Sequence, residues 1–330
     1  MSNFQDAKAV VRAYQAGIDT AAPDAVGAAL AAYTSTDYLW RGMHPFDIRH
    51  GASEVADIFW SPLKTALTSL TRREDIFMAG RNQMDDFSSI WVVSMGHLMG
   101  LHDAPWLGIP ATRKMAFLRY AEFSKVVGGK ITETALFCDI PHFMVQAGVN
   151  PFPPQTAAHL VQPGPVTHTG RMDTAQNPAE GEKTLAVINA MINDLGTWQS
   201  DLPLAEELAR TWNDDMIWWG PAGIGATYTI ARYAEQHAGP FRASFTNRTG
   251  TGHLCRLAEG EFGGFFGWPN FTATATGGFM GLPATGKTGE FRVVDIYRRG
   301  GEKLSENWVF IDLLHWLKGQ GLDVLGRLNA

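Results

Sequence analysis

The segment that decides the fold contains, in order, G-L-P-A-T-G-K (281–287), a strand-like run through Asp295, G-G-E-K-L-S-E (300–306) and I-D-L-L-H (311–315). An earlier segment repeats this order as G-I-P-A-T-R-K (108–114), a run through Glu122, G-G-K-I-T-E (128–133) and C-D-I-P-H (138–142). A single interval of 173 residues relates the matched positions, which are Gly108/Gly281, Lys114/Lys287, Glu122/Asp295, Lys130/Lys303, Glu133/Glu306, Asp139/Asp312 and His142/His315. Composition alone does not keep such a register, so we infer an internal duplication of about half the chain.

Each half begins with helical periodicity and continues with strand-like alternation. In the second half, apolar residues recur at helical spacing over 185–195, a further helix is expected over 204–212, and the aromatic run 216–219 predicts a strand. The remainder alternates apolar and polar residues between Gly-Gly turns, as in Phe291–Tyr297. Helices first and a mainly antiparallel sheet afterwards predict an α+β fold, in which the helices pack on one face of the sheet.

The two halves are separated by a segment of different composition. Residues 150–178 are rich in proline, polar and small residues and show no periodicity. A stretch of this length is a linker or a strap laid over the surface, and Phe152, Leu160 and Val161 favour the strap. We therefore predict a domain at 1–149, a linker or strap at 150–180, and a second domain at 181–330.

Composition limits the class of protein. With 330 residues the chain has room for two ordinary domains, and 45% hydrophobic with 18% charged residues is typical of a compact soluble protein. A net charge of −6 without a basic run argues against a nucleic-acid partner. No apolar stretch reaches the roughly 20 residues that cross a bilayer, and the first residues lack the pattern of a signal peptide. We predict a cytoplasmic protein that binds neither nucleic acid nor membrane.

Several segments of the second repeat carry a family resemblance. They are W-G-P-A-G (219–223), G-F-M-G-L-P-A-T-G-K (278–287), D-I-Y-R (295–298) and E-N-W (306–308). Together they resemble the SnoaL-like polyketide cyclases of the nuclear-transport-factor-2-like (cystatin-like) superfamily of α+β cones. The first repeat is a diverged version, with Arg113 at the glycine position, Ala135 at the tryptophan position and an insertion, H-D-A-P-W-L, at 102–107.

The resemblance implies two tandem cone-shaped domains, each a curved, mainly antiparallel sheet packed on about three helices and enclosing a pocket. It further implies a protein related to polyketide (ester) cyclases, with cofactor-free acid–base chemistry on a small carbonyl compound: aldol cyclisation, isomerisation or dehydration. The family's histidine at the start of H-x-G-x-F-x-G is Thr276 here, so this chemistry does not carry over unchanged. A non-catalytic small-molecule-binding or assembly protein on the same cone is the alternative, because a fold does not fix a function.

A carboxylate in an apolar pocket suits proton removal next to a carbonyl group, because desolvation raises its pKa toward neutrality. Asp295, between Val294 and Ile296, is the preferred catalytic residue in the pocket of the second repeat, with Glu290 as the reserve and Glu122 as the counterpart in the first repeat. Asp295 and Glu290 are five residues apart, so only one can face the pocket on a regular strand. The alternative for each is a solvent-facing strand residue paired with an arginine.

Aromatic strand residues are candidates for pocket walls. We expect Trp219 and Trp308 to line the second pocket, and further ligand-contact candidates are Trp40, His97 and Phe310. Packing in the core is the alternative for the aromatic residues, and a surface or satisfied core histidine is the alternative for His97.

Asp139 and Asp312 each follow a strand and precede an apolar helical run. This position indicates a helix N-cap, whose side chain accepts a backbone N–H of the first turn. A repeated Asp–His dyad with His142 and His315 is the alternative.

No cofactor and no metal site are expected. The histidines of the first half lack metal-binding spacings, and Cys138 and Cys255 stand at non-equivalent positions among apolar residues. G-L-P-A-T-G-K-T (281–288) matches a phosphate-binding loop by letter but continues into a strand pattern rather than a helix. The predicted partner is a small hydrophobic carbonyl-containing ligand. We also expect the two repeats to pack through their sheets as an intramolecular pseudo-dimer, with a further homo-oligomer left open.

Overall fold

Two units, each with its own sheet and helices, make up the part of the chain that the computed structural model describes, residues 3–196 and 202–328. Unit 1 is built from Met1–Pro151, Val166–Ala175 and Asp323–Ala330. Unit 2 is built from Phe152–Pro165 and Gln176–Leu322. The segment predicted as a linker or strap is therefore divided between the two units.

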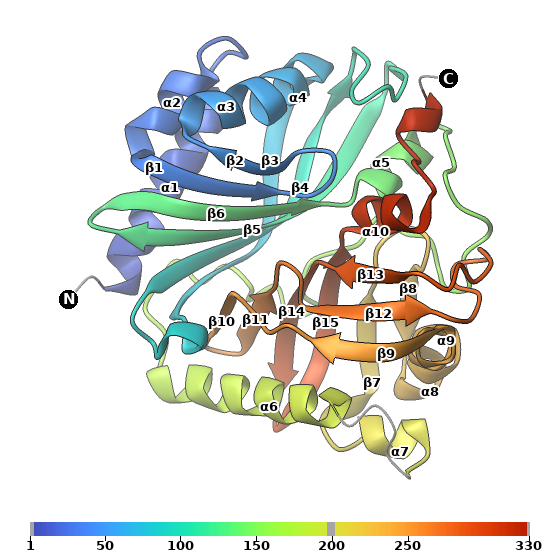
Figure 1. Cartoon of the computed structure of the whole chain (residues 1–330). Helices are drawn as coiled ribbons and strands as arrows, with labels where there is room; N and C mark the ends of the chain where they lie inside the picture. The colour runs from blue at the N-terminus through green and yellow to red at the C-terminus, as the bar shows by residue number, and fades with distance from the viewer. Residues whose placement is uncertain (1–2, 197–201, 329–330) are drawn as a thin grey trace. The chain divides into compact units, whose positions relative to one another are not determined.

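Unit 1 packs helices against one six-stranded sheet of order β2-β1-β6-β5-β4-β3 (Figure 1). Its β1 and β6 run parallel and the other neighbouring strands run antiparallel. The elements are α1 (Phe4–Thr20), α2 (Val26–Tyr33), β1 (Thr34–Gly42), β2 (Asp47–His50), α3 (Ala52–Val55), the π-helical η1 (Ala56–Trp60), α4 (Ser61–Ala66), β3 (Leu67–Arg81), η2 (Gln83–Asp85), β4 (Ile90–His102), β5 (Met115–Val127), β6 (Lys130–Cys138), α5 (Ile140–Gln146) and η4 (Gly326–Leu328).

Unit 2 has a six-stranded sheet of order β10-β11-β14-β15-β7-β8 and a separate three-stranded sheet of order β13-β12-β9. Figure 1 shows α6 along the sheet that contains β10 and β11. The elements are α6 (Pro178–Gly196), α7 (Leu204–Leu208), β7 (Trp212–Trp219), β8 (Ala226–Tyr228), α8 (Ile230–Tyr233), the π-helical η3 (Ala234–Ala238), α9 (Gly239–Ser244), β9 (Phe245–Gly250), β10 (Cys255–Glu259), β11 (Phe262–Phe266), β12 (Phe271–Ala275), β13 (Thr288–Phe291), β14 (Val293–Gly300), β15 (Lys303–Ile311) and α10 (Leu313–Gln320).

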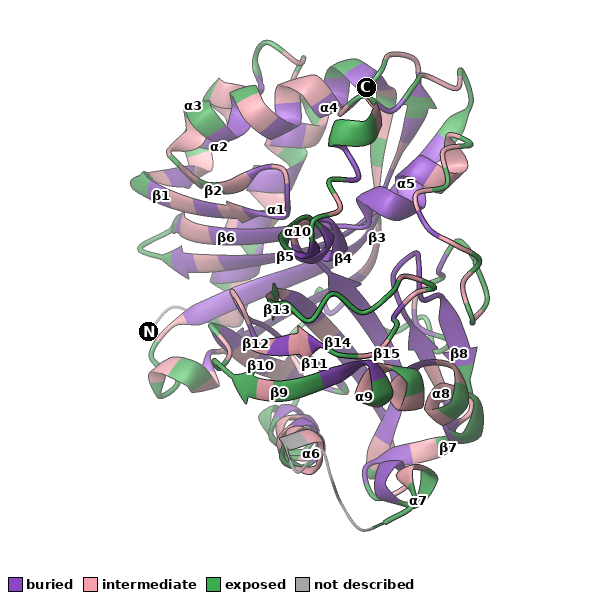
Figure 2. Ribbon diagram, turned by 45° about the vertical axis from the view of Figure 1, so that its right-hand side comes forward, coloured by how far each residue is buried: buried purple, intermediate pink, exposed green. Residues whose placement is uncertain are grey.

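Both units are therefore α+β bodies with open, mainly antiparallel sheets covered by helices, and the predicted fold class is confirmed. Figure 2 shows β14 and β15 as buried strands and β9 as a largely exposed one. Residues on both faces of β15 are buried.

The duplication extends to irregular details of the backbone. The hairpin β5–β6 has a β-bulge in which Thr132 is the extra residue, and the hairpin β14–β15 has one at Ser305. Asp139 and Asp312 both cap a following helix, accepting hydrogen bonds from the backbone N–H of His142 at 3.0 Å and of His315 at 3.2 Å. The N-cap interpretation is confirmed in both repeats.

The third helix of each unit contains a π-helical turn. In unit 1 the turn Ala56–Trp60 lies between α3 and α4, and in unit 2 the turn Ala234–Ala238 lies between α8 and α9. A π-helical turn rotates the side chains that follow it relative to a regular α-helix, and such turns are frequent at functional sites.

Two predicted elements need correction. The helix expected over 204–212 ends at Leu208, and Trp212 already begins β7. The strand expected over Phe291–Tyr297 is broken at Arg292, because Phe291 ends β13 in the small sheet and Val293 begins β14 in the large one. The break separates Glu290 from Asp295 into two different sheets.

The segment between the repeats hydrogen-bonds to the unit to which each part belongs. In unit 2, Ala158 pairs with Ala226, and the Trp308 indole N–H donates to the Pro163 carbonyl oxygen at 3.0 Å. In unit 1, the Phe77 N–H donates to the Gly170 carbonyl oxygen at 2.9 Å. Phe152 is buried, whereas Leu160 and Val161 are exposed. Among the described residues, no helix combines the length and apolar character needed to cross a membrane.

Candidate functional site in unit 2

Unit 2 encloses a cavity of about 380 Å³. Its walls come from α6, from the helix that runs through α8, η3 and α9, and from the inner face of the sheet strands β7, β11, β14 and β15. The gap between the large and the small sheet supplies further lining residues, including His253 and Asn270. This volume lies within the range typical of small-molecule sites.

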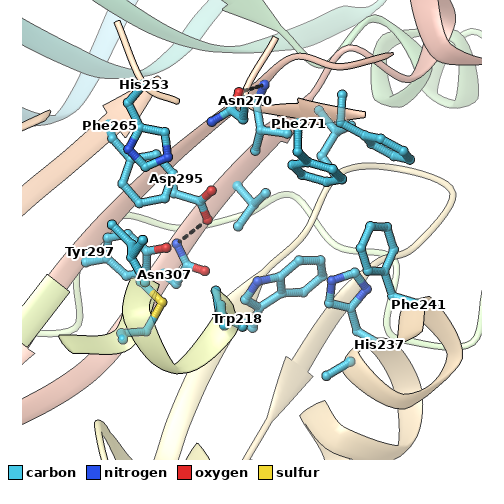
Figure 3. A pocket seen from close by; sticks show the side chains of 18 of the residues that line it. Trp218, His237, Phe241, His253, Phe265, Asn270, Phe271, Asp295, Tyr297 and Asn307 are labelled. Carbon is cyan, nitrogen blue, oxygen red and sulfur yellow. Dashed lines mark hydrogen bonds between the residues drawn. The ribbon is translucent and has the colours of Figure 1, made fainter. Parts of the chain in front are cut away.

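Asp295, on β14, is a carboxylate that lines this cavity and is partly accessible from it (Figure 3). The Asn307 amide donates a hydrogen bond to its Oδ1 at 3.2 Å. Burial raises the pKa of Asp295 to about 6, while hydrogen bonds with Asn307 and Tyr297 act in the opposite direction. No ion pair to Asp295 occurs within residues 3–196 and 202–328. The raised pKa therefore reflects removal from water that no cation compensates.

The strand pairing decides which other side chains share the face of Asp295. Side chains two residues apart lie on one face, so Tyr297 points with Asp295 into the cavity. Across the sheet, Asp295 pairs with Phe265 of β11 and Val309 of β15, and these side chains also line the cavity. Tyr297 pairs with Asn307 in the same way. The polar side chains that β14 and β15 contribute to the cavity are therefore Asp295, Tyr297 and Asn307, and the rest of the lining adds Arg242, Arg248 and Arg256.

The bulge at Ser305 explains why Trp308 is not in this group. Counting from the Gly300–Lys303 end of the hairpin without a bulge places Trp308 opposite Asp295, whereas the extra residue moves Val309 there. A slip of one residue exchanges the two faces of a strand. Trp308 is fully buried on the opposite face, where its indole N–H reaches Pro163.

Trp219 and Phe310 likewise lie outside the lining of this cavity. Trp219 is 9% exposed and borders a different hollow of about 730 Å³, together with Leu160 and Tyr228. Phe310 is buried beside Val309 on the opposite face of β15. The tryptophan of β7 that does line the cavity is the neighbour of Trp219, Trp218.

Glu290 lies on β13 in the small sheet and does not line the cavity. Its side chain is 48% exposed, stands 3.3 Å from His315 Nε2, and lies 4.0 Å from Arg292. This arrangement corresponds to the expected alternative of a solvent-facing strand residue paired with an arginine.

His237 is a cavity-lining residue that the sequence reasoning missed. It lies on the π-helical turn η3, and its ring stacks on Trp218 with centroids 4.0 Å apart and an interplanar angle of 19°. Burial lowers the pKa of His237 to about 3, so the ring is neutral near pH 7. Figure 3 shows Trp218 between Asn307 and His237.

His253 is a second missed histidine, at the gap between the two sheets. Its ring stacks on Phe265 with centroids 3.9 Å apart. Arg256 donates to its Nδ1 at 3.2 and 3.0 Å, so the proton of the neutral ring resides on Nε2. Burial, together with Arg256 and Arg248, lowers the pKa of His253 to about 3.

In unit 1 the counterpart Glu122 has different surroundings. It is 1% exposed, its Oε1 accepts a hydrogen bond from the Tyr14 hydroxyl at 3.2 Å, and its Oε2 lies 3.8 Å from Arg72 Nη1. Burial raises the pKa of Glu122, and Arg72 is the largest influence in the opposite direction. This carboxylate is enclosed and compensated by a cation.

The other candidates of unit 1 are also packed against protein groups. Trp40 is fully buried and contacts Phe46 and Phe59 in an aromatic cluster. His97 is buried on β4, with its Nδ1 3.6 Å from Asp75 Oδ2 and its ring edge-on to Phe117. No group of three or more His, Cys, Asp or Glu side chains suited to a metal ion occurs in the described residues.

A signal for the missed residues was present in part. Once Asp295 is placed in a pocket, alternation along the strand predicts Tyr297 beside it. Asn307 and Trp218 follow only if the bulge is known, and His237 follows only if the π-helical turn is known. Neither irregularity has a sequence signature that we recognise.

Helices that cover an open sheet, with a carboxylate in the cavity between them, define unit 2 as an α+β cone. Within this class, residues 269–319 match the sequence model of the SnoaL-like polyketide cyclase family. The resemblance read from the second repeat is therefore confirmed over this segment, which includes Asp295, Tyr297 and Asn307. No curated protein sequence matches the chain significantly.

Several solved structures resemble this chain. A candidate SnoaL-like polyketide cyclase from Jannaschia sp. CCS1 is 18% identical, with 47% of this chain and 98% of that chain covered at a TM-score of 0.36. An NTF2-like protein from Burkholderia xenovorans LB400 is 15% identical, with 42% and 97% covered at a TM-score of 0.34. An NTF2-like protein from Burkholderia thailandensis E264 is 20% identical, with 44% and 98% covered at a TM-score of 0.33.

Proposed function

We propose that unit 2 is the working domain of a protein related to the SnoaL-like polyketide (ester) cyclases, and that it performs cofactor-free acid–base chemistry on a small hydrophobic carbonyl compound. The observation that carries this proposal is the state of Asp295. It is a cavity-lining carboxylate with a pKa of about 6 and no ion pair within the described residues. A general acid–base catalyst works best when its pKa lies near the working pH.

In the proposed reaction, the Asp295 carboxylate removes a proton from the carbon next to a carbonyl group, and the electron pair moves to the carbonyl oxygen as an enolate. In an aldol closure, the enolate carbon forms a bond to a second carbonyl carbon of the same molecule, and the alkoxide takes the proton back from Asp295. Isomerisation uses the two proton transfers without the new carbon–carbon bond. The Asn307 N–H, which donates to Oδ1, holds the carboxylate in place.

The alternative is a non-catalytic ligand-binding or assembly protein. The stacked pairs Trp218–His237 and Phe265–His253 favour a flat, unsaturated ligand in either case. A pocket of this kind binds such a ligand whether or not Asp295 moves a proton. The two functions therefore differ in proton transfer and not in binding.

Deuterium exchange separates them. Ethyl benzoylacetate, an aromatic β-keto ester, is incubated with the protein in D₂O, and loss of its α-proton signal is followed by NMR against the rate without protein. Asp295→Asn keeps the shape of the side chain and removes its titrating group, so exchange is expected to fall about 10²-fold. Glu290→Gln is the matched control on the small sheet and is expected to leave the rate unchanged.

The pH dependence follows from the same carboxylate. The ionised form is the base, so the exchange rate is expected to rise through pH 6 and to level off above it. Binding of the β-keto ester without exchange supports the non-catalytic alternative. Full exchange by the Asp295→Asn variant moves the assignment to Glu290 or to Glu122 of unit 1. A cytoplasmic location remains a prediction from the sequence.

A further inference from the structure

His237 is a polar ring at a position where the duplicated fold requires only an aromatic one. Trp40 of unit 1 and Trp218 of unit 2 are equivalent, because they pair with Thr134 and Asn307, which are themselves equivalent in the repeat. The residue that follows each tryptophan by 19 positions lies on the π-helical turn of its unit, and it is Phe59 in unit 1 and His237 in unit 2.

Both rings pack on the tryptophan of their unit, Phe59 in a tilted arrangement and His237 in a stacked one. Phe59 lies 5.6 Å from Trp40 between ring centroids, and His237 lies 4.0 Å from Trp218. Phe59 is 1% exposed and belongs to an apolar aromatic cluster, whereas His237 is 9% exposed and lines the cavity. Packing on the tryptophan therefore does not require the nitrogens of His237.

One nitrogen of His237 also lacks a structural explanation within the described residues. Nδ1 is fully enclosed and has no hydrogen-bond partner within residues 3–196 and 202–328. A buried polar atom without a partner is costly, and in native structures such an atom needs an explanation. Because Nδ1 is enclosed, Nε2 is the nitrogen that can form a hydrogen bond with a molecule in the cavity.

We propose that His237 Nε2 donates a hydrogen bond to an oxygen of the ligand that is remote from the carbon at which Asp295 acts. This inference rests on the proposed function, because it takes the ligand of that same cavity to be a carbonyl compound. The lowered pKa supports a neutral ring that carries one N–H, which is a donor for a carbonyl or hydroxyl oxygen.

The geometry of the sheet sets the span of the ligand. Asp295 lies on β14, and His237 stacks over Trp218 of β7, with β15 between these two strands. Two strand spacings amount to roughly 10 Å, so one small carbonyl group does not reach both residues. The ligand class is therefore an elongated molecule with an acidic C–H at one end, a flat apolar body, and an oxygen acceptor at the other end.

Two probes test this geometry. Ethyl 3-(4-acetylphenyl)-3-oxopropanoate carries a β-keto ester and, across a benzene ring, an acetyl oxygen. Ethyl 3-(4-isopropylphenyl)-3-oxopropanoate has the same shape without that oxygen. His237→Phe places the aromatic residue of unit 1 at this position, so it keeps an aromatic contact with Trp218 and removes the ring nitrogens. Binding of both probes to the full chain and to the variant is measured by calorimetry.

The variant is expected to bind the acetyl probe about tenfold more weakly, the usual effect of one neutral hydrogen bond. Its affinity for the isopropyl probe is expected to stay within about twofold, and its melting temperature to stay close to that of the parent protein. In the parent protein labelled with ¹⁵N-histidine, one protonated ring nitrogen is expected to shift with the acetyl probe and not with the isopropyl probe.

Equal losses of affinity for the two probes, or no loss for either, overturn the role of His237. If exchange by Asp295 remains intact in that case, the proposed function stands without it. If the parent protein binds neither probe, the elongated ligand and the role of His237 are wrong, and the proposed function is then judged by the exchange of ethyl benzoylacetate alone.

Discussion

Glu122 of unit 1 and Asp295 of unit 2 stand at the same position of the duplicated sheet, and their surroundings differ in charge. Glu122 is enclosed, accepts a hydrogen bond from Tyr14 and lies beside Arg72. Asp295 faces a cavity, and its hydrogen bonds are with the neutral side chains of Asn307 and Tyr297. The pKa is raised by burial in both copies, but Glu122 lies beside a cation and Asp295 does not, so an acid kept at a repeat position does not indicate chemistry by itself.

The sheets of the two units differ in a way that accompanies this contrast. In unit 1, β3 and β4 are long strands that pair along one continuous sheet. In unit 2 the corresponding region is interrupted twice. The chain passes from β9 in the small sheet to β10 in the large one, and from β11 in the large sheet to β12 in the small one. The division places His253 and Asn270 at the cavity. The division therefore brings polar residues of the connecting loops to the cavity.

The largest change in stability is expected when the cation beside Glu122 in unit 1 is removed. Arg72→Met leaves Glu122 buried without its compensating charge, which should cost about 3–5 kcal/mol of unfolding free energy at pH 8. Without Arg72 the folded-state pKa of Glu122 rises further above its unfolded value. Since the folded state then favours the protonated acid, the loss should shrink as the pH falls toward 4. Urea unfolding at several pH values measures this.

The control for that variant is the double substitution Arg72→Met with Glu122→Gln. It removes the buried negative charge together with its partner, so much of the lost stability should return and the pH dependence should weaken. If the single and double variants are equally unstable, packing by the long Arg72 side chain and not the charge pair explains the loss.

The second prediction concerns the stability of unit 2. The pKa of Asp295 is about 6 in the folded state, above the ordinary value of 3.8, so the folded state binds this proton more tightly than the unfolded state. Wild-type stability should therefore decline as the pH rises from about 4 to 6 and stay lower above that range. Asp295→Asn lacks this titration and should be more stable than wild type by about 1–3 kcal/mol at pH 8.

The measurement is urea unfolding of both proteins at pH 4.5 and pH 8. The advantage of the Asp295→Asn variant should be large at pH 8 and small at pH 4.5. A constant difference at the two pH values would mean that Asp295 is not held in a desolvated state. A protein that becomes more stable when it loses its proposed base is what a destabilised active site predicts.

The regular parts of the fold could be predicted from the sequence. The interval of 173 residues indicates the repeat, and the Gly-Gly turns indicate the hairpins. The aspartates before apolar runs indicate the helix caps. These are local signals, because turn geometry and capping act over three or four residues. The family resemblance was likewise carried by contiguous segments.

The site was predicted less well, because its composition depends on irregular backbone. Asp295 was placed from its apolar neighbours, and the cavity does contain it. Trp219 and Trp308 were chosen as aromatic strand residues, and the structure places both outside the lining of this cavity; for Trp308 the reason is the bulge at Ser305, which is invisible in the sequence. One extra residue in a strand moves every following side chain to the opposite face of the sheet. Whether Asp295 is the catalytic residue stays a prediction.

The smallest expected effect concerns a position where the two units do not differ. Gly128 and Gly301 open equivalent hairpin turns, with φ angles of +57° and +68°. A Cβ built at either position meets no atom within 4 Å, so substitution is resisted by the backbone conformation and not by crowding. Gly128→Ala and Gly301→Ala should therefore each cost about 1 kcal/mol, by the same amount within error. Asn, which tolerates this conformation, should cost less at both positions.

Urea unfolding of the four variants checks this. A clear difference between the Gly128 and Gly301 pairs would show that the hairpins are equivalent in register but not in energy, and the contrast between Glu122 and Asp295 would then need a backbone contribution as well as an electrostatic one.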